Sequence, residues 1–412
     1  MSSYVGAGQN FQYELPFASS AVPASMKSNL APRPLNCSLT TVNVPSTSGS
    51  AAPSGISTIQ VPLGQGAYMV NPYLRFKFAL TGGTDAQTFT FKGGVGCASS
   101  LISSYQTTLN STIIDNCQNA GLGVYDTILA HGTSADWLSK DAKVLMGAGR
   151  TFTVAANAVT QVFVLPLIGL LGAQQAFPLW ACQGTLQINI NWASLAGSVV
   201  SAALAGNVAY SEVSLVYDRI SVESDFISKM KADMMASNAK YVYNYTNYQI
   251  VQAPTVDGQS TINTGLNVSS LRGVVLTSLA ANSATTLAGT GKSLVTGLGN
   301  FNVTLDGRNI NNNVLDAVNA PAVVFAEMQK CFNKVFDASV TDSCDNATYL
   351  TDAFAAGVSA SRVAEGLAFQ GSPVSVVGCQ ITQTSATGTN TLLFISDYSL
   401  VIGADSSVDL IR

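Results

Sequence analysis

Charged residues are scarce in this chain of 412 residues. Asp, Glu, Lys and Arg together make up 10% of the sequence, against about 25% in an ordinary soluble protein, and the formal net charge is −4. Apolar residues nevertheless make up 47%, which is enough for a sizeable core and argues against a disordered chain. This composition is typical of proteins that bury much of their surface in an assembly, where bare charges would be costly to desolvate.

Histidine is almost absent, and this weakens the case for an enzyme. His131 is the only one, so a nucleophile paired with histidine and a metal site with several histidines are both excluded within one chain. We expect His131 to be a structural residue at a helix end. The sequence indicates no catalytic residue, no cofactor and no metal site, and we predict that the protein is not an enzyme. A glycan-active enzyme with paired carboxylates stays open as an alternative.

Three further signals are missing. The seven cysteines are odd in number and form no C-x-x-C pair, so neither a zinc site nor a disulfide framework is indicated, and we expect buried free thiols. No stretch reaches the ~20 uncharged apolar residues of a membrane-spanning helix. The N-terminus has neither the basic nor the apolar region of a secretion signal, so we expect a protein that is not secreted by that route.

Residues 1–58 are predicted to form an extended, irregular arm. Six of the thirteen prolines lie there, and proline removes backbone donors and restricts the preceding residue. The arm has no cluster of Lys and Arg, so we expect no direct sequence-specific binding of nucleic acid. Its scattered apolar residues suggest docking on protein or on a membrane surface, although a frayed terminus is an open alternative. The candidate assembly contacts are Phe11, Tyr13, Leu15 and Phe17.

From about residue 59 the pattern is that of β-structure. Apolar and polar residues alternate with period two in several short runs that are separated by Gly, Pro, Asn and Asp, which is typical of half-buried strands. The clearest runs are 73–80, 88–92, 159–165, 185–192 and 210–217. Helical spacing is rare and is found near 122–129, 225–237 and 325–335.

The two halves of this β-region resemble each other. Three segments of the first half match three of the second in the same order and at nearly constant offset, which indicates a duplication. The pairs are 70–75 with 268–272, 109–114 with 305–310, and 211–217 with 396–402. We therefore predict two β-domains of one topology, 59–224 and 240–412, joined by a linker helix within 225–239.

Two other motifs favour loops. Gly289–Ser293 (GTGKS) lacks the earlier glycine of a phosphate-binding loop, and the acidic run that contains Asp337, Asp342, Asp345 and Asp352 lacks the spacing of a calcium loop. We interpret both as surface loops. The stretch Leu279–Asn300 is a further candidate for an exposed loop.

The whole pattern resembles the double jelly-roll major capsid proteins. The features that carry the resemblance are the irregular arm, a strand at Tyr105–Ile114 that leads into a helix at Leu122–Ala130, a closing strand at Glu212–Ser221, a connecting helix, and a second domain that repeats this plan and ends in Leu392–Val401. The family includes capsid proteins of tailless, membrane-containing phages, of virophages and large DNA viruses, and the adenovirus hexon.

The resemblance implies an all-β protein with two tandem eight-stranded jelly-roll barrels and a few short helices in loops. It also implies a structural capsid protein of the virion that forms pseudo-hexagonal homotrimers, which then contact neighbouring capsomers in an icosahedral shell. Minor capsid or penton proteins and an internal membrane would be reached through the N-terminal arm. Two alternatives stay open: a single jelly-roll capsid protein with an unlike projecting domain, and a carbohydrate-binding or adhesive β-protein.

Overall fold

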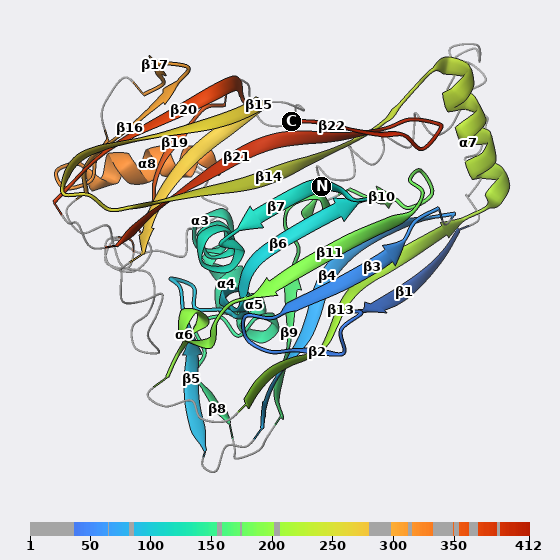
Figure 1. The fold of residues 1–412 in the computed structure, drawn as a ribbon, viewed down its shortest axis with the longest axis horizontal. Coiled ribbons are helices and arrows are strands. Elements are labelled where there is room, and N and C mark those ends of the chain that lie inside the picture. Colours follow the sequence, from blue (N-terminus) through green and yellow to red (C-terminus); the bar gives the residue numbers. More distant parts are fainter. Residues whose placement is uncertain are drawn as a thin grey trace.

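The computed structural model describes residues 37–64, 66–81, 86–154, 159–173, 175–201, 207–279, 298–311, 315–332, 349, 354–361, 370–384 and 388–412. The described chain forms two β-domains, with a projecting helix, α7 (Ser224–Ser237), between them in sequence (Figure 1).

The first domain is built from eight principal strands in two sheets. In chain order they are β1 (Cys37–Pro45), β3 (Ile56–Pro62), β4 (Ala67–Thr81), β6 (Ile102–Leu109), β7 (Thr112–Gln118), β9 (Val159–Pro166), β11 (Thr185–Trp192) and β13 (Asn207–Val222). One sheet has the order β1-β13-β4-β9 and the other β3-β11-β6-β7, all antiparallel. If the strands are numbered one to eight along the chain, these orders are 1-8-3-6 and 2-7-4-5, which is the jelly-roll arrangement.

Alternation of apolar and polar residues makes these segments strands and gives them a common core. Inward-pointing aromatic residues from the two sheets meet there: Trp192 stacks on Tyr210 with ring centroids 4.1 Å apart, and Phe76 lies 5.0 Å from Trp192. The Trp192 indole N–H donates to the Ser57 hydroxyl at 2.9 Å, so its polar atom is satisfied in the core.

The second domain repeats the same strand orders. Its strands are β14 (Tyr241–Pro254), β15 (Gly258–Leu279), β16 (Leu298–Leu305), β17 (Arg308–Asn309), β18 (Leu315–Asp316), β19 (Ala356–Ser359), β20 (Ser372–Gln383), β21 (Thr389–Ile402) and β22 (Val408–Ile411). The long strand β15 serves as second and third strand, because its register shifts between Gly265 and Leu271 and its two halves pair with different neighbours. The resulting orders, β14-β21-β15-β19 and β15-β20-β16-β17, are again 1-8-3-6 and 2-7-4-5.

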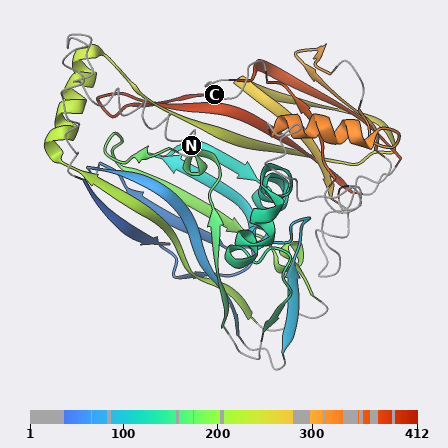
Figure 2. The same ribbon diagram turned by 180° about the vertical axis from the view of Figure 1, so that it is seen from behind.

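Helices and short strands complete the fold. In the first domain, β5 (Gln87–Phe91) pairs with β8 (Phe152–Val154) and β12 (Val199–Val200), and β2 (Ser50–Ala51) and β10 (Phe177–Pro178) extend the larger sheet. The helices are η2 (Ala98–Leu101), the π-helical turn η3 (Ala120–Tyr125), α3 (Asp126–Gly132), α4 (Ala135–Ser139), α5 (Asp141–Leu145), η4 (Gly169–Gly172), α6 (Leu195–Ser198) and, in the second domain, α8 (Pro321–Cys331). Figure 2 shows α8 lying on one face of the second domain and α3 in the first domain below it.

Two of the three matching pairs of segments lie on equivalent parts of the two domains, and the third pair does so in part. Segments 211–217 and 396–402 belong to β13 and β21, the eighth strands. Segment 70–75 belongs to the third strand β4, whereas 268–272 spans the register shift of β15 at which its third-strand half begins. Segments 109–114 and 305–310 contain the turns between fourth and fifth strands. Each turn has two residues in the left-handed region, Asn110-Ser111 and Asp306-Gly307, as a two-residue hairpin requires.

Two expectations from the sequence are corrected here. The predicted single strand Tyr105–Ile114 is a hairpin of β6 and β7, because the backbone reverses at Asn110-Ser111. Residues 37–58, predicted to be part of the irregular arm, contain β1, β2 and the start of β3. Their many Ser, Thr and Val residues pair with β13 and β11, since hydrogen bonding across a sheet outweighs weak local preference. Residues 1–36 lie outside the described residues, and the division 1–58, 59–224, 225–239 and 240–412 stays a prediction.

Candidate functional site at the seam between the two domains

The two domains meet along a seam, by which we mean the contact of β14 with β7, η3, η4 and the segment around β10. Figures 1 and 2 both show β14 lying over β7. Each of these strands is the edge of its own sheet. The seam therefore joins an edge of the second domain to an edge of the first and sets how the two β-units lie against each other.

Tyrosines at alternate positions of β14 form the centre of the seam. The Tyr241 ring lies 6.2 Å from Trp180, and the Tyr243 ring lies 5.4 Å from Phe177, both edge to face. The Tyr243 hydroxyl lies 3.3 Å from the carbonyl of Leu170 and 3.2 Å from that of Gln175, both of which can accept its proton. Buried aromatic rings with satisfied hydroxyls make a strong, geometrically specific contact.

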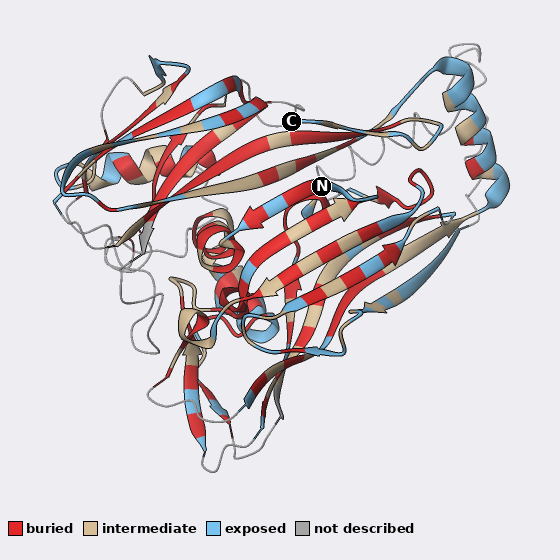
Figure 3. Ribbon diagram, in the orientation of Figure 1, coloured by how far each residue is buried: buried red, intermediate tan, exposed pale blue. Residues whose placement is uncertain are grey.

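The linker helix α7 reaches the same contact. The ammonium group of Lys231 lies 6.0 Å from the centre of the Trp180 ring, within the range of a cation–π interaction. Ile227 and Met230 are buried, whereas most of the helix is exposed (Figure 3). The helix therefore lies at one end of the seam and packs through one face, as its apolar spacing predicts.

A buried carboxyl group, Asp115 on β7, lies inside the seam. Its Oδ2 accepts a hydrogen bond from the Leu170 amide at 2.8 Å. Burial raises the pKa of Asp115 to about 7, and hydrogen bonds from the Leu170 amide and the Tyr245 hydroxyl limit the rise. The Tyr245 hydroxyl also lies 3.5 Å from the Ile114 carbonyl. Asp115 is therefore a group within the seam whose charge changes near neutral pH.

Glycine at position 169 makes room for this carboxyl group. Its φ is +68°, a value that side chains rarely adopt, and a Cβ there would lie 2.6 Å from Oδ2 of Asp115. Both the backbone conformation and the close approach thus require glycine.

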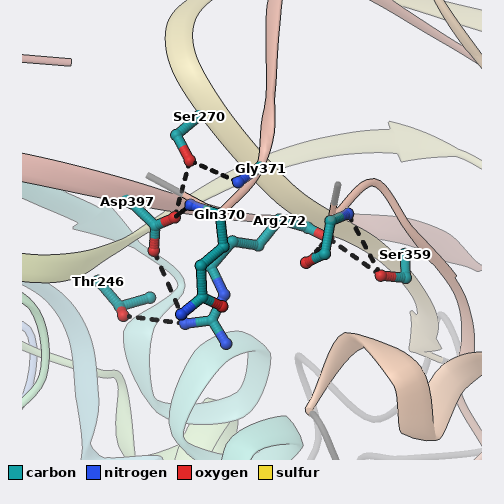
Figure 4. Close-up of polar contacts among 8 residues, drawn as sticks. Thr246, Ser270, Arg272, Ser359, Gln370, Gly371 and Asp397 are labelled. Carbon is teal, nitrogen blue, oxygen red and sulfur yellow. Dashed lines mark hydrogen bonds and ion pairs between the residues drawn. The ribbon is translucent and has the colours of Figure 1, made fainter. Parts of the chain in front are cut away.

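A polar cluster lies within the second domain (Figure 4). Asp397 Oδ2 accepts hydrogen bonds from the Ser270 hydroxyl at 2.7 Å and the Gln370 amide at 3.0 Å. Its Oδ1 lies 3.7 Å from Nη1 of Arg272, which also donates to the Thr246 hydroxyl at 3.4 Å. The ion pair is largely buried, so the cluster joins β14, β15, β21 and the segment before β20 through charge-assisted bonds.

Tyr248 connects this cluster to the seam. Burial raises the pKa of Tyr248 to about 12, while the positive charge of Arg272 opposes the rise and Cys117 of β7 contributes to it. Tyr248 therefore lies within electrostatic range of Cys117 in the first domain and of Arg272 in the cluster.

Close backbone approach and helix packing complete the seam. A Cβ on Gly123 in η3 would clash with Cδ1 of Ile250 on β14. The buried ring of His131, in the last turn of α3, lies 6.4 Å from each of the rings of Phe332 and Tyr349 in the second domain. The only histidine thus packs between the domains.

The candidate assembly contacts Phe11, Tyr13, Leu15 and Phe17 lie outside the described residues, as do Gly289–Ser293 and the acidic positions Asp337, Asp342, Asp345 and Asp352. Within the described ranges, no group of three or more His, Cys, Asp or Glu residues could hold a metal ion. Among the helices that the structure describes, none is long and apolar enough to span a membrane.

The cysteines follow expectation with one exception. Cys97, Cys117, Cys182, Cys331 and Cys379 are buried free thiols. Cys37 is also free but is exposed, because it begins β1, a strand that is exposed along most of its length. Cys344 lies outside the described residues.

Sequence reasoning missed the seam, although one signal for it is visible. The run Tyr241-x-Tyr-x-Tyr245 places three aromatic rings on one face of a strand. Large aromatic residues at period two on an edge strand indicate a covered face. Asp115, Gly169 and Arg272 carry no comparable local signal.

Comparison with known proteins identifies the architecture. The sequence matches no protein-family model and no curated protein. Among solved structures, VP54 of PBCV-1, in a crystal structure fitted into a reconstruction of the virophage Sputnik, is 14% identical, with 93% of this chain and 98% of that chain covered and a TM-score of 0.65. The Faustovirus major capsid protein is 8% identical, with 95% and 96% covered and a TM-score of 0.59. The STIV major capsid protein is 10% identical, with 87% and 96% covered and a TM-score of 0.52.

The strand orders and the seam define a protein of two tandem jelly rolls in fixed contact. The likeness to these structures spans nearly the whole chain, and it shows that the chain has the double jelly-roll fold of viral major capsid proteins. The resemblance inferred from the sequence is therefore confirmed at the level of the fold.

Proposed function

We propose that this chain is the major capsid protein of an icosahedral virus and forms pseudo-hexagonal homotrimeric capsomers. The observation that carries the proposal is the pair of jelly rolls with identical strand order, held by one packed seam. Three such chains present six similar units, which can form a near-hexagonal block that tiles a closed lattice. Structures of capsid proteins with the same fold support the proposal.

The low charge of the chain fits an assembly role. A capsomer must bury large interfaces, and obligate interfaces of this kind cover about 2,000–5,000 Å² and are more apolar than the remaining surface. With only 10% charged residues, this chain can bury such areas without many unpaired ions. We propose a structural role rather than catalysis, with no cofactor and no direct sequence-specific binding of nucleic acid.

The other contacts are proposed on the same basis. Capsomers would contact neighbouring capsomers in the virion shell, and residues 1–36, with Phe11, Tyr13, Leu15 and Phe17, would contact neighbours, minor capsid or penton proteins, or an internal membrane. Deletion of residues 1–36 should leave the capsomer intact and reduce its assembly into shells, as judged by electron microscopy. Unchanged shell yield would contradict this role of the arm.

The test of the main proposal is the mass and shape of the purified chain. Light scattering behind size exclusion should give three times the chain mass of 42.7 kDa, and negative-stain images should show a hexagonal outline. A stable monomer would contradict the proposal, and binding to a glycan array would then favour a carbohydrate-binding protein. The alternative with an unlike projecting domain does not fit the two identical strand orders.

A further inference from the structure

We propose that the seam is a pH-sensitive joint, in which ionisation of Asp115 lets the two jelly rolls separate locally while each keeps its fold. Mild acid closes this joint and mild alkali loosens it. The inference concerns the contact between the two domains of one chain, and it does not depend on the proposed capsid role.

The seam can open without breaking a sheet. Within the described ranges, no strand of one domain pairs with a strand of the other. The hydrogen bonds described across the seam come instead from the hydroxyls of Tyr243 and Tyr245, which reach main-chain carbonyls of the first domain. These side-chain contacts can be lost while the backbone ladders of both domains stay intact. Local separation therefore requires less free energy than the unfolding of either domain.

Asp115 lies at the point of this contact that is most sensitive to charge. The residue is 2% exposed, and its Oδ2 accepts a hydrogen bond from the Leu170 amide at 2.8 Å. Its Oδ1 has no well-aligned partner among the described residues, so the interaction with the Tyr245 hydroxyl of β14 is a loose one. A neutral carboxyl group tolerates this site, whereas a carboxylate there is buried with one oxygen poorly satisfied.

The second domain supplies much of the cover over this carboxyl group. Five titratable groups lie within its electrostatic range: Tyr243 and Tyr245 of β14, Tyr398 of β21, Tyr105 of β6 and Cys117 of β7. Burial raises the pKa of all five, so they are neutral near pH 7. The charge of Arg412 acts on Tyr245 and Tyr398. Separation of the domains thus returns water to Asp115 without breaking an ion pair of this group.

The size of the effect follows from thermodynamic linkage. Burial raises the pKa of Asp115 from 3.8 to about 7 in the closed seam, and solvent restores the lower value when the seam opens. The equilibrium constant for opening then rises about tenfold between pH 6 and pH 8 and levels off at higher pH. His131 also packs between the domains, and a proton gained there on acidification would loosen the seam in the opposite direction. A comparison of chains that differ only at Asp115 cancels that contribution.

Two thiols of the full-length chain report on the joint. Cys117 is buried on β7 two residues from Asp115, hence on the same side of the strand, and becomes reactive when the seam opens. Cys379 is buried on β20 and becomes reactive only when the second domain unfolds. Pulses of N-ethylmaleimide, followed by mass spectrometry of the peptides, should modify Cys117 while Cys379 stays unmodified. The Cys117 rate of wild type divided by that of Asp115→Asn should rise about tenfold from pH 6 to pH 8, since the ratio cancels the pH dependence of the thiol itself.

Two further variants sharpen the test. Asp141→Asn, on the exposed first turn of α5, should follow the wild type at every pH. Tyr245→Phe removes a donor that favours the carboxylate, so the midpoint of the Cys117 profile should move to higher pH, whereas a merely structural tyrosine would change the rate equally at every pH. If Asp115→Asn does not fold, wild-type rates divided by those of the chain unfolded in urea at the same pH give the same profile.

Two results would overturn the proposal. A Cys117 ratio that stays constant from pH 6 to pH 8 would show that Asp115 does not control the seam. Equal rates for Cys117 and Cys379 would show that the chain opens only as a whole, so that the seam is not a separate joint. Neither result bears on the proposed capsomer, which the mass of the purified chain tests independently.

Discussion

The buried carboxyl group of Asp115 should make the stability of the folded chain depend on pH in the neutral range. Its pKa rises from 3.8 in an exposed carboxyl to about 7 in the seam. Well below pH 4 the group is protonated in both folded and unfolded chains. Between pH 4 and 7 the unfolded chain loses the proton while the folded chain retains it, so the free energy of unfolding falls as pH rises, and the loss is complete above about pH 8.

The size of the effect follows from the same two pKa values. Each tenfold change in proton affinity corresponds to about 1.4 kcal/mol, so full ionisation disfavours the folded state by about 4 kcal/mol. About 2–3 kcal/mol of this falls between pH 5 and pH 8. Asp115→Asn keeps the shape of the side chain and removes the titration. The variant should therefore gain stability relative to wild type by about 2–3 kcal/mol over this range.

The assay is urea unfolding of both proteins at pH 5, 6, 7 and 8, followed by tryptophan fluorescence, since Trp180 lies in the seam. Protein concentration is held constant because assembly stabilises the folded chain. Asp141→Asn, on the exposed first turn of α5, serves as the control and should retain the pH dependence of wild type. Identical pH dependence of wild type and Asp115→Asn would refute the reasoning, as would a wild type that gains on the variant as pH rises.

Further substitutions test the packing of the seam and the ion pair of the polar cluster. Gly169→Ala should lower the free energy of unfolding by about 2 kcal/mol, as measured by thermal melting. The alanine would have a positive φ, and its Cβ would lie 2.6 Å from the buried carboxyl group of Asp115. Gly123→Ala should also destabilise, and Ile250→Ala should restore part of the loss in a double-mutant cycle, because the new methyl group clashes with that side chain. Arg272→Met should cost about 3 kcal/mol in urea unfolding, because it leaves Asp397 largely buried without its cation.

Each of these predictions has its own control. Gly149→Ala also places alanine at a positive φ, of +60°, but with nothing within 4 Å, so a loss equal to that of Gly169→Ala would show that the carboxylate contact contributes nothing. Additive losses for Gly123→Ala and Ile250→Ala would contradict their contact. Adding Asp397→Asn to Arg272→Met should recover part of the stability, since the amide is neutral, and no recovery would argue against the ion pair.

The local sequence predicted the structure in two situations. In one, a single residue determines the backbone conformation; in the other, the spacing of apolar residues determines which face of a strand is buried. The alternation in 185–192 predicts a strand, and β11 spans that range. Two of the three matched pairs of segments lie on equivalent parts of the domains because strands in the same topological place bury the same face. The sequence did not reveal the reversal at Asn110-Ser111, because two residues without glycine carry only a weak turn signal, whereas Asp306-Gly307 at the equivalent place carries a strong one.

The sequence pattern did not predict the seam between the two domains. Asp115, Gly169 and Tyr245 are far apart in the chain and have no shared period. Which sheet edge of one domain meets which edge of the other depends on the packing of whole domains, and the raised pKa of Asp115 depends on the burial that this packing produces.

The amino-acid sequence alone indicated the all-β fold class, because period-two strands, few helices and an internal repeat are local or compositional properties that any fold of the chain must accommodate. Only the tertiary structure decided how the two jelly rolls contact each other and that a carboxyl group is buried between them. These are properties of surfaces assembled from distant segments, and a linear pattern does not encode which surfaces meet.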